Sequence, residues 1–141
     1  MFSTLAMAVR LAAFTPTATV AAPKATLRLA VADTDRSRER GLMGVAALPA
    51  HAGMVFVFAA DGPVQFWMKN TLIPLDMVFV SARGTVRSVA SWVPTVPGAT
   101  PDDWIPSRAG VAKYVIELNA GEAAKDGIVP GAKIVGLTRL R

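Results

Sequence analysis

Two carboxylates stand inside apolar, strand-like segments of the sequence. Asp76 lies between Leu75 and Met77, and Glu117 lies in "KYVIELN". A carboxylate in such a segment costs folding free energy unless it is paired or accepts several hydrogen bonds. If the two groups converge, one has a raised pKa and can act as an acid or base, and two carboxylates are the minimum for glycoside hydrolysis. The structural alternative is that Asp76 binds the backbone amides of residues 69 to 72, while Glu117 pairs with a basic side chain.

An aromatic and polar cluster precedes Asp76 in "QFWMKNTLIPLD". In an extended chain Trp67 and Lys69 share one face, opposite two apolar side chains. An indole exposed beside a cation is a platform for a sugar ring, although Trp67 can instead cover a second core layer. Asn70 and Thr71 are expected to bond to the backbone of the following turn. The predicted binding residues are Trp67, Lys69, Asn70, Thr71, Asp76 and, from a proline-rich loop, Trp104.

Metal and cofactor chemistry has little support in the sequence. There is no cysteine, which excludes disulfides, thiol catalysis and thiolate metal sites. Phosphate-binding glycine loops and nucleophile-elbow motifs are absent, so no cofactor is predicted. A third hypothesis is a Cu(I) site of thioethers and one imidazole, against the alternative that the methionines fill gaps in a core. Its ligands would be Met43, Met54, Met68 and His51.

Period-2 patterns dominate the elements that must position these residues. Strands are expected at residues 25–33, 53–58, 64–70, 75–80, 85–93 and 113–119, with a last one near the C-terminus. The segment "AADGP" is expected to form a turn after the second of these strands, and Gly84 is expected to supply a positive φ in the hairpin between the fourth and the fifth. In the strand at 113–119, Tyr114, Ile116 and Leu118 are expected on one face and Val115 on the other. Short helices are expected after Thr34 or Asp35, ending at Gly41 or Gly44, and after Asn119, ending at Gly127. Arg36, Arg38 and Arg40 are expected to spread around the first helix as a solvated surface. The prolines of residues 94–107 predict a long loop, which is usually functional or mobile.

These elements predict a mainly β fold. Two short helices cannot supply the crossovers of a parallel sheet, so we expect a single small antiparallel, barrel-like domain over residues 23–141. Residues 1–22 contain no acidic residue and end in small residues, which favours a signal peptide or a disordered leader. The domain is therefore expected in the periplasm or outside the cell, and otherwise in the cytoplasm. With a net charge of +5 but no basic stripe, it is expected to bind no nucleic acid, although an anionic membrane face could attract it.

Three segments carry a family resemblance. "RGLMGVAALPAHAGMVFVF", "FWMKNTLIPLDMVFV" and "YVIELNAGEAAKDGIVPGAKI" resemble successive blocks of the DUF192 family, over roughly residues 26 to 138. The resemblance implies a compact β-rich, barrel-like domain, often behind a signal peptide or lipid anchor, and it implies no reaction. The sequence departs from the family pattern at Gly44 and Val45, where the family tends to carry an aromatic and a basic residue.

Three function hypotheses remain. The leading one is a non-enzymatic envelope domain that binds a small molecule, a glycan or an envelope protein through the surface around Trp67. The second is a hydrolase of cell-wall sugars that uses Asp76 and Glu117, and it requires the two carboxyl groups to lie about 5–10 Å apart around a cleft. The third is the Cu(I) carrier.

Overall fold

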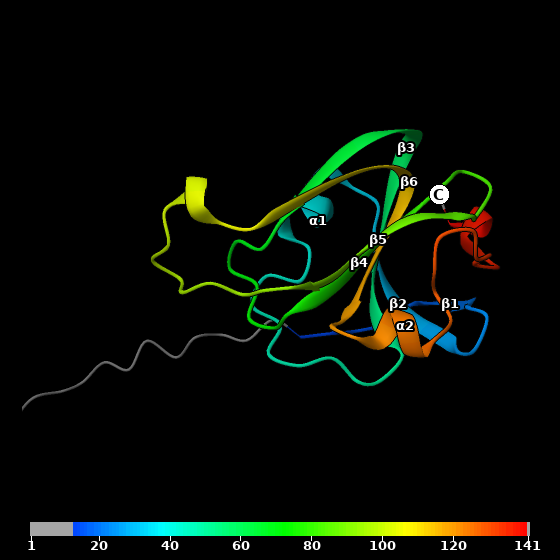
Figure 1. Ribbon diagram of the computed structural model, residues 1–141, viewed down its shortest axis with the longest axis horizontal. Helices are drawn as coiled ribbons and strands as arrows, with labels where there is room; N and C mark the ends of the chain where they lie inside the picture. Colours follow the sequence, from blue (N-terminus) through cyan, green and yellow to red (C-terminus); the bar gives the residue numbers. More distant parts are fainter. Residues whose placement is uncertain (1–12, 141) are drawn as a thin grey trace, which may run out of the picture.

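A computed structural model describes residues 13–140, which form one six-stranded mixed sheet with two short α-helices (Figure 1). The elements in chain order are β1 (Ala18–Ala21), β2 (Thr26–Ala32), α1 (Asp35–Arg40), β3 (Ala52–Trp67), β4 (Leu75–Val80), β5 (Val86–Val93), the 3-10 helix η1 (Asp102–Trp104), β6 (Ser107–Asn119), α2 (Glu122–Lys125) and the 3-10 helix η2 (Leu137–Arg139). The prediction of a mainly β fold is confirmed.

The sheet order is β1-β2-β3-β6-β4-β5, and all neighbouring pairs are antiparallel except β2 and β3. The expectation of an antiparallel sheet is therefore wrong for this one pair. Between β2 and β3, residues 33–51 include α1 and are long enough to carry the chain back across the sheet, which is what a parallel connection needs.

Strand β3 also differs from the prediction. The segment "AADGP" was expected to form a turn between two strands, but β3 runs through it for 16 residues. The register against β6 shifts between Val57 and Gly62, so the strand bends there instead of ending. Asp61, in the bend, accepts hydrogen bonds from the Arg87 guanidinium and from the Ala82 backbone N–H. The bend therefore keeps one long strand in contact with both the β4–β5 hairpin and β6.

Apolar clusters cover both faces of the sheet, because β6 and β4 alternate across it. Tyr114, Ile116 and Leu118 belong to one cluster, and Val115 belongs to the other. This confirms the predicted division of β6 into two faces. The same alternation determines the face of the sheet on which each polar side chain of β4 and β6 lies.

Several local predictions hold and others do not. Thr34 caps α1, and Gly84 has the positive φ expected in the β4–β5 hairpin. Asn119 does not cap α2, because its side-chain amide donates to the Leu48 carbonyl. The predicted last strand is reduced to two isolated bridges, at Lys133 and Val135.

The described fold extends into the segment before residue 23 that the sequence assigned to a leader. Residues 18–21 form β1, which pairs with β2 and places Val20 in the core. Residues 1–12 of the predicted leader lie outside the described residues, so the leader stays a prediction. Among residues 13–140, no helix has the length and apolar character needed to cross a membrane.

Candidate functional site

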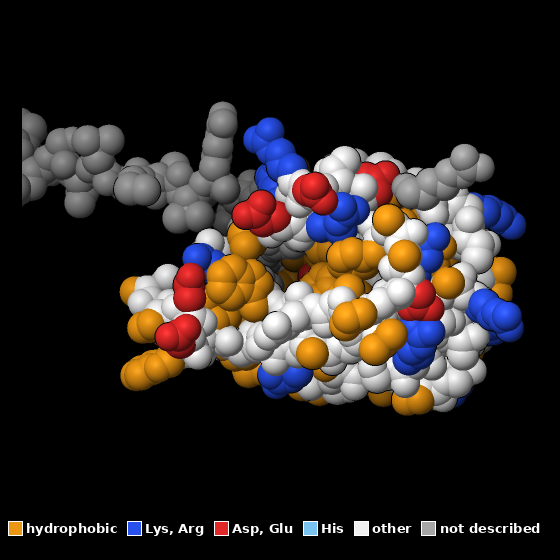
Figure 2. Space-filling model, turned by 90° about the horizontal axis from the view of Figure 1, so that it is seen from above, with side chains coloured by type: hydrophobic (Ala, Val, Ile, Leu, Met, Phe, Trp, Pro, Cys, Tyr) orange, Lys and Arg blue, Asp and Glu red, His pale blue; other side chains and the backbone are white. Residues whose placement is uncertain are grey.

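A cavity of about 260 Å³ lies between α1 and the sheet, and we call it the α1 cavity. Figure 2 shows a hollow on this face with hydrophobic side chains along its walls and charged side chains of both signs around it. Its apolar lining comprises Leu42, Met43, Phe56, Phe58, Phe66 and Trp67. Its polar lining comprises Arg38, Glu39, Arg40, Gln65, Lys69, Thr71 and Glu117. The cavity is therefore an aromatic box with a polar rim.

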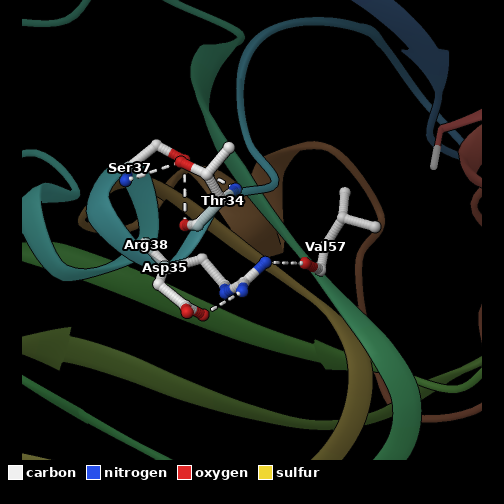
Figure 3. A network of polar contacts seen from close by, with 5 residues as sticks. All are labelled: Thr34, Asp35, Ser37, Arg38 and Val57. Carbon is white, nitrogen blue, oxygen red and sulfur yellow. Dashed lines mark hydrogen bonds and ion pairs between the residues drawn. The ribbon is translucent and has the colours of Figure 1, made fainter.

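Helix α1 forms one wall of this cavity and is held by a small polar network (Figure 3). Thr34 and Ser37 form a capping box, in which the Thr34 hydroxyl accepts from the Ser37 N–H and the Ser37 hydroxyl accepts from the Thr34 N–H. Arg38 donates to the Val57 carbonyl at 2.8 Å and pairs with Asp35 at 2.7 Å. The Val57 carbonyl lies where the β3–β6 register shifts, so Arg38 ties α1 to the bend of β3.

Gly41 lets the chain leave α1 close to the aromatic wall. Its φ is +49°, and a β-carbon at this position would lie 3.2 Å from the Phe56 ring. A larger residue here would be strained and would press on that ring. The Phe66 ring in turn packs edge-to-face against Phe56 and Phe58, with centroid distances of 4.8 and 6.1 Å. The rings of the box thus support one another.

Glu117 lines the cavity and is 4% exposed. Burial raises its pKa to about 8, and no neighbouring charge or hydrogen bond among the described residues offsets that burial. At neutral pH the carboxyl is therefore mostly protonated. A neutral carboxyl group both donates and accepts a hydrogen bond, so Glu117 offers a ligand one group of each kind.

Trp67 lies at the mouth of the cavity with 41% of its surface exposed. The Lys69 ammonium lies 5.0 Å from the ring centroid of Trp67 and 3.2 Å from a carboxylate oxygen of Asp102. Trp67 also lines two more open hollows, of about 470 and 400 Å³, that share lining residues with the cavity. The second of these is also lined by Asn70. One exposed indole thus joins three adjoining hollows.

The DUF192 profile, described as an uncharacterized ACR, matches residues 17–136. The chain belongs to the DUF192 family. The match begins one residue before β1, in agreement with the place of that strand in the fold.

Two solved structures resemble this DUF192 protein closely. A crystal structure described as a putative transcription regulator from Sinorhizobium meliloti 1021 has 34% identity and a TM-score of 0.72, covering 85% of this chain and 93% of that one. A protein of unknown function from Novosphingobium aromaticivorans DSM 12444 has 33% identity and a TM-score of 0.68, covering 84% and 82% of the two chains. No curated protein matches the chain.

The DUF192 fold does not bring Asp76 and Glu117 together. Asp76 is paired with Leu118 and Glu117 with Met77, so the two carboxyl groups lie on opposite faces of adjacent strands. Asp76 is 1% exposed and accepts from the backbone N–H groups of Trp92 at 2.9 Å and Ala123 at 3.0 Å. It therefore binds backbone amides, as the structural alternative predicted, but those of β5 and α2 instead of residues 69–72.

The other predicted binding residues fall into two groups. Lys69 and Thr71 line the α1 cavity with Trp67, and the Thr71 hydroxyl donates to the Lys69 carbonyl, which precedes it, instead of to the turn that follows. Trp104 is 77% exposed on η1, in the long connection that projects from the sheet in Figure 1. It lines neither the α1 cavity nor the two other hollows that Trp67 borders. From the same loop, Asp102, Asp103 and Ile105 line the hollow of about 470 Å³ that Trp67 also borders.

The four predicted copper ligands lie in different surroundings. Met68 is 1% exposed in the core, Met43 lines the α1 cavity, and Met54 lines a separate hollow. The imidazole of His51 faces carboxylates, with Nδ1 2.8 Å from an oxygen of Asp126. The four residues therefore do not come together at either of these two hollows.

Sequence reasoning missed the contribution of α1 and of the phenylalanines. The arginines of α1 were interpreted as a solvated surface, but Arg38 and Arg40 line the cavity. The available signal was the long connection between β2 and β3, which has to cross the sheet and so places a helix over it. Phe56 and Phe58 also lie two residues apart, which directs both rings to one face of a strand.

Proposed function

We propose that this protein is a non-enzymatic binding module that holds a hydroxylated ring, such as a sugar unit of a cell-envelope glycan, in the α1 cavity. The observation that carries the proposal is the combination, in one cavity, of an exposed indole and a buried carboxyl group with no protein partner among the described residues. The indole can stack on the apolar face of a ring, and the carboxyl group can form hydrogen bonds with hydroxyl groups.

The chemistry of the cavity matches a sugar better than an ion or a flat hydrocarbon. A pyranose ring presents C–H groups on its faces, which stack on an indole, and hydroxyl groups around its edge. A neutral Glu117 can donate to one hydroxyl oxygen and accept from another. Two of the cations near the mouth are paired, Arg38 with Asp35 and Lys69 with Asp102, and the other two charged lining residues, Glu39 and Arg40, have opposite signs, so the rim presents no excess of one charge to an ionic ligand.

The size of the cavity supports recognition of one ring. At about 260 Å³ the α1 cavity lies just below the range of roughly 300–1,000 Å³ that is typical of small-molecule sites. The two hollows that Trp67 also lines extend the surface beyond the cavity. Neighbouring units of an oligosaccharide can therefore lie across the indole while one unit enters the cavity.

No structural observation favours the hydrolase. A glycosidase needs two carboxyl groups that flank one bond, whereas Asp76 is turned to the opposite face and already accepts two backbone hydrogen bonds. Glu117 alone supplies an acid without a base or nucleophile. The proposal is accordingly for binding without reaction.

An envelope location and a barrel-like closure complete the proposal. The location rests on the signal-like composition of residues 1–22. The closure rests on the segment after α2, in which Val135 bridges to Ala21 at one edge of the sheet and Lys133 bridges to Thr85 near the other. This segment links the two edges, so it limits how far the sheet can flatten and open the cavity.

The test is a titration of the protein with the tetramer of N-acetylglucosamine, and with malto- and cellotetraose, followed by ¹H–¹⁵N NMR. We expect one of them to shift the indole N–H signal of Trp67. Trp67→Ala should weaken binding at least about tenfold, equivalent to roughly 1.4 kcal/mol, while the matched control Trp104→Ala should leave it within about twofold. Binding that survives Trp67→Ala, or no binding of any of the three glycans, would contradict the proposal.

A further inference from the structure

A second cluster of ligating side chains lies away from the α1 cavity, where the loop before β3 meets α2. We call His51, Glu122 and Asp126 the His51 cluster. Nδ1 of His51 is 2.8 Å from Asp126 Oδ1 and 3.7 Å from Glu122 Oε1. The backbone N–H of His51 also donates to Glu122 Oε1 at 2.7 Å. One ligating atom from each residue lies within 4.8 Å of the others.

Two carboxylate oxygens of this cluster are buried without a partner. They are Oε2 of Glu122 and Oδ2 of Asp126, and no hydrogen bond reaches either one within the described residues. Glu122 is 8% exposed and Asp126 is 1% exposed. A buried charged acceptor that loses water without gaining a donor is strongly destabilising. These oxygens therefore call for a ligand that the polypeptide does not supply.

The charges of the cluster lead to the same conclusion. Two carboxylates can carry two negative charges, and the ion pairs found among residues 13–140 give them only the imidazole of His51 as a partner. Even when protonated, His51 supplies one positive charge. Buried charges are stable when paired or bound to a metal, so a divalent cation would balance the cluster.

We propose that His51, Glu122 and Asp126 bind a divalent transition-metal ion, with one imidazole nitrogen and two carboxylate oxygens as protein ligands. This donor set suits Zn²⁺, which binds histidine nitrogen and carboxylate oxygen at about 2.0–2.2 Å. Tetrahedral bonds of that length separate neighbouring donors by about 3.3–3.5 Å. The observed 2.8 and 3.7 Å lie on either side of this value, and all three donor atoms lie within 4.8 Å of one another, so side-chain rotation has to close the cluster around the ion.

The site is accessible and joins two parts of the fold. The His51 side chain is about half exposed, which leaves an entry path and room for a water ligand. A bound ion would tie the loop before β3 to α2, whose Ala123 N–H already donates to Asp76. The ion would thus reinforce the face of the sheet opposite the α1 cavity, and it has no part in the proposed ligand binding.

The experiment uses the full chain without a histidine tag, treated with chelator and titrated with ZnCl₂ by calorimetry. His51 is the only histidine of the chain, so the imidazole ¹⁵N signals report on this one residue. We expect one Zn²⁺ per chain, a shift of the Nδ1 or Nε2 resonance and a rise in the unfolding temperature.

The variants separate the site from adventitious binding. His51→Ala and Asp126→Asn should each weaken Zn²⁺ binding at least about tenfold, because even residues outside the ligand shell of a metal are worth about 10–100-fold. Asp103→Asn, which removes an exposed carboxylate on η1, should have no effect. His51 is partly exposed, so His51→Ala tests the site even if Asp126→Asn fails to fold. Zn²⁺ binding that both variants retain, or no change in the imidazole signals, would overturn the proposal.

Discussion

Asp76 and Glu117 lie on neighbouring strands, one register position apart. Their side chains lie on opposite faces of the sheet, and the surroundings of the two carboxyl groups differ. On one face the Asp76 carboxylate accepts two backbone N–H groups from separate elements and so joins β4, β5 and α2. On the other face Glu117 has burial but no partner among the described residues, and it borders a cavity. The comparison shows that a buried carboxyl is structural when its oxygens are occupied and available to a ligand when they are not.

The largest effect should come from removing the occupied carboxylate. Asp76→Ala leaves the N–H groups of Trp92 and Ala123 without their acceptor, and hydrogen bonds to a charged group contribute roughly 1.5–3 kcal/mol each. We expect a loss of about 3–5 kcal/mol in the free energy of unfolding, measured with urea at pH 7. A loss below about 1 kcal/mol would mean that Asp76 is not structural. Asp103→Asn, at an exposed site, is the control.

The pH dependence should distinguish Glu117 from Asp76. Because folding raises the pKa of Glu117 from 4.5 to about 8, the unfolded chain releases this proton first as pH rises. The contribution of Glu117 therefore destabilises the fold progressively between about pH 4.5 and 8 and is absent below that window. Glu117→Gln, which cannot ionise, should stabilise the protein by roughly 2–4 kcal/mol at pH 9 and change it little at pH 4. Equal effects at both pH values would contradict this assignment.

A smaller effect is expected from the link between α1 and the bend of β3. Arg38→Met removes the hydrogen bond to the Val57 carbonyl and should cost about 1–2 kcal/mol, while also loosening one wall of the cavity. Arg36→Met, on the same helix but exposed, is the matched control. Urea unfolding measures the difference. If the two variants behaved alike, α1 would not be anchored through Arg38.

The smallest effect should come from the helix cap. Thr34→Ala removes one acceptor from the N-terminus of α1 and should cost about 1 kcal/mol. Ser81→Ala, in the β4–β5 hairpin, removes a different hydroxyl that accepts a backbone N–H and controls for a general effect. Hydrogen exchange should show faster opening of α1 in the Thr34 variant only. Unchanged exchange in α1 would show that the cap does not limit its stability.

The sequence predicted local features better than their assembly. Alternation in β6, the cap at Thr34 and the hairpin at Gly84 follow from short-range rules, and each is confirmed. The parallel pairing of β2 and β3 depends on where a long connection packs, which the period-2 pattern does not report. The bend of β3 was mistaken for a turn because "AADGP" has turn composition, whereas bonds from Arg87 and Ala82 hold Asp61 in a strand.

The candidate site was predicted in part for the same reason. The motif "FWMKNT" placed Trp67, Lys69 and Thr71 together because they are close in the chain, and all three line the cavity. The place of Glu117 beside them depends on the pairing of β3 with β6, in which Phe66 lies opposite Arg108 and Met54 lies opposite Glu117. Residue types do not reveal how strands pair, so the sequence could not predict the place of Glu117. For the same reason it could not predict that Asp76 lies on the opposite face of the sheet from Glu117.

The most direct test of the account is the titration of the Glu117 carboxyl carbon by ¹³C NMR, with Glu117→Gln to assign its signal. We expect this one carboxyl to titrate with a pKa of about 8 and to be still largely protonated at pH 7. Addition of a glycan that binds beside Trp67 should shift the same signal. A carboxyl that titrates near the ordinary value of about 4.5 would contradict the account, because Glu117 would then be a solvated or paired anion and not a neutral group that faces a ligand.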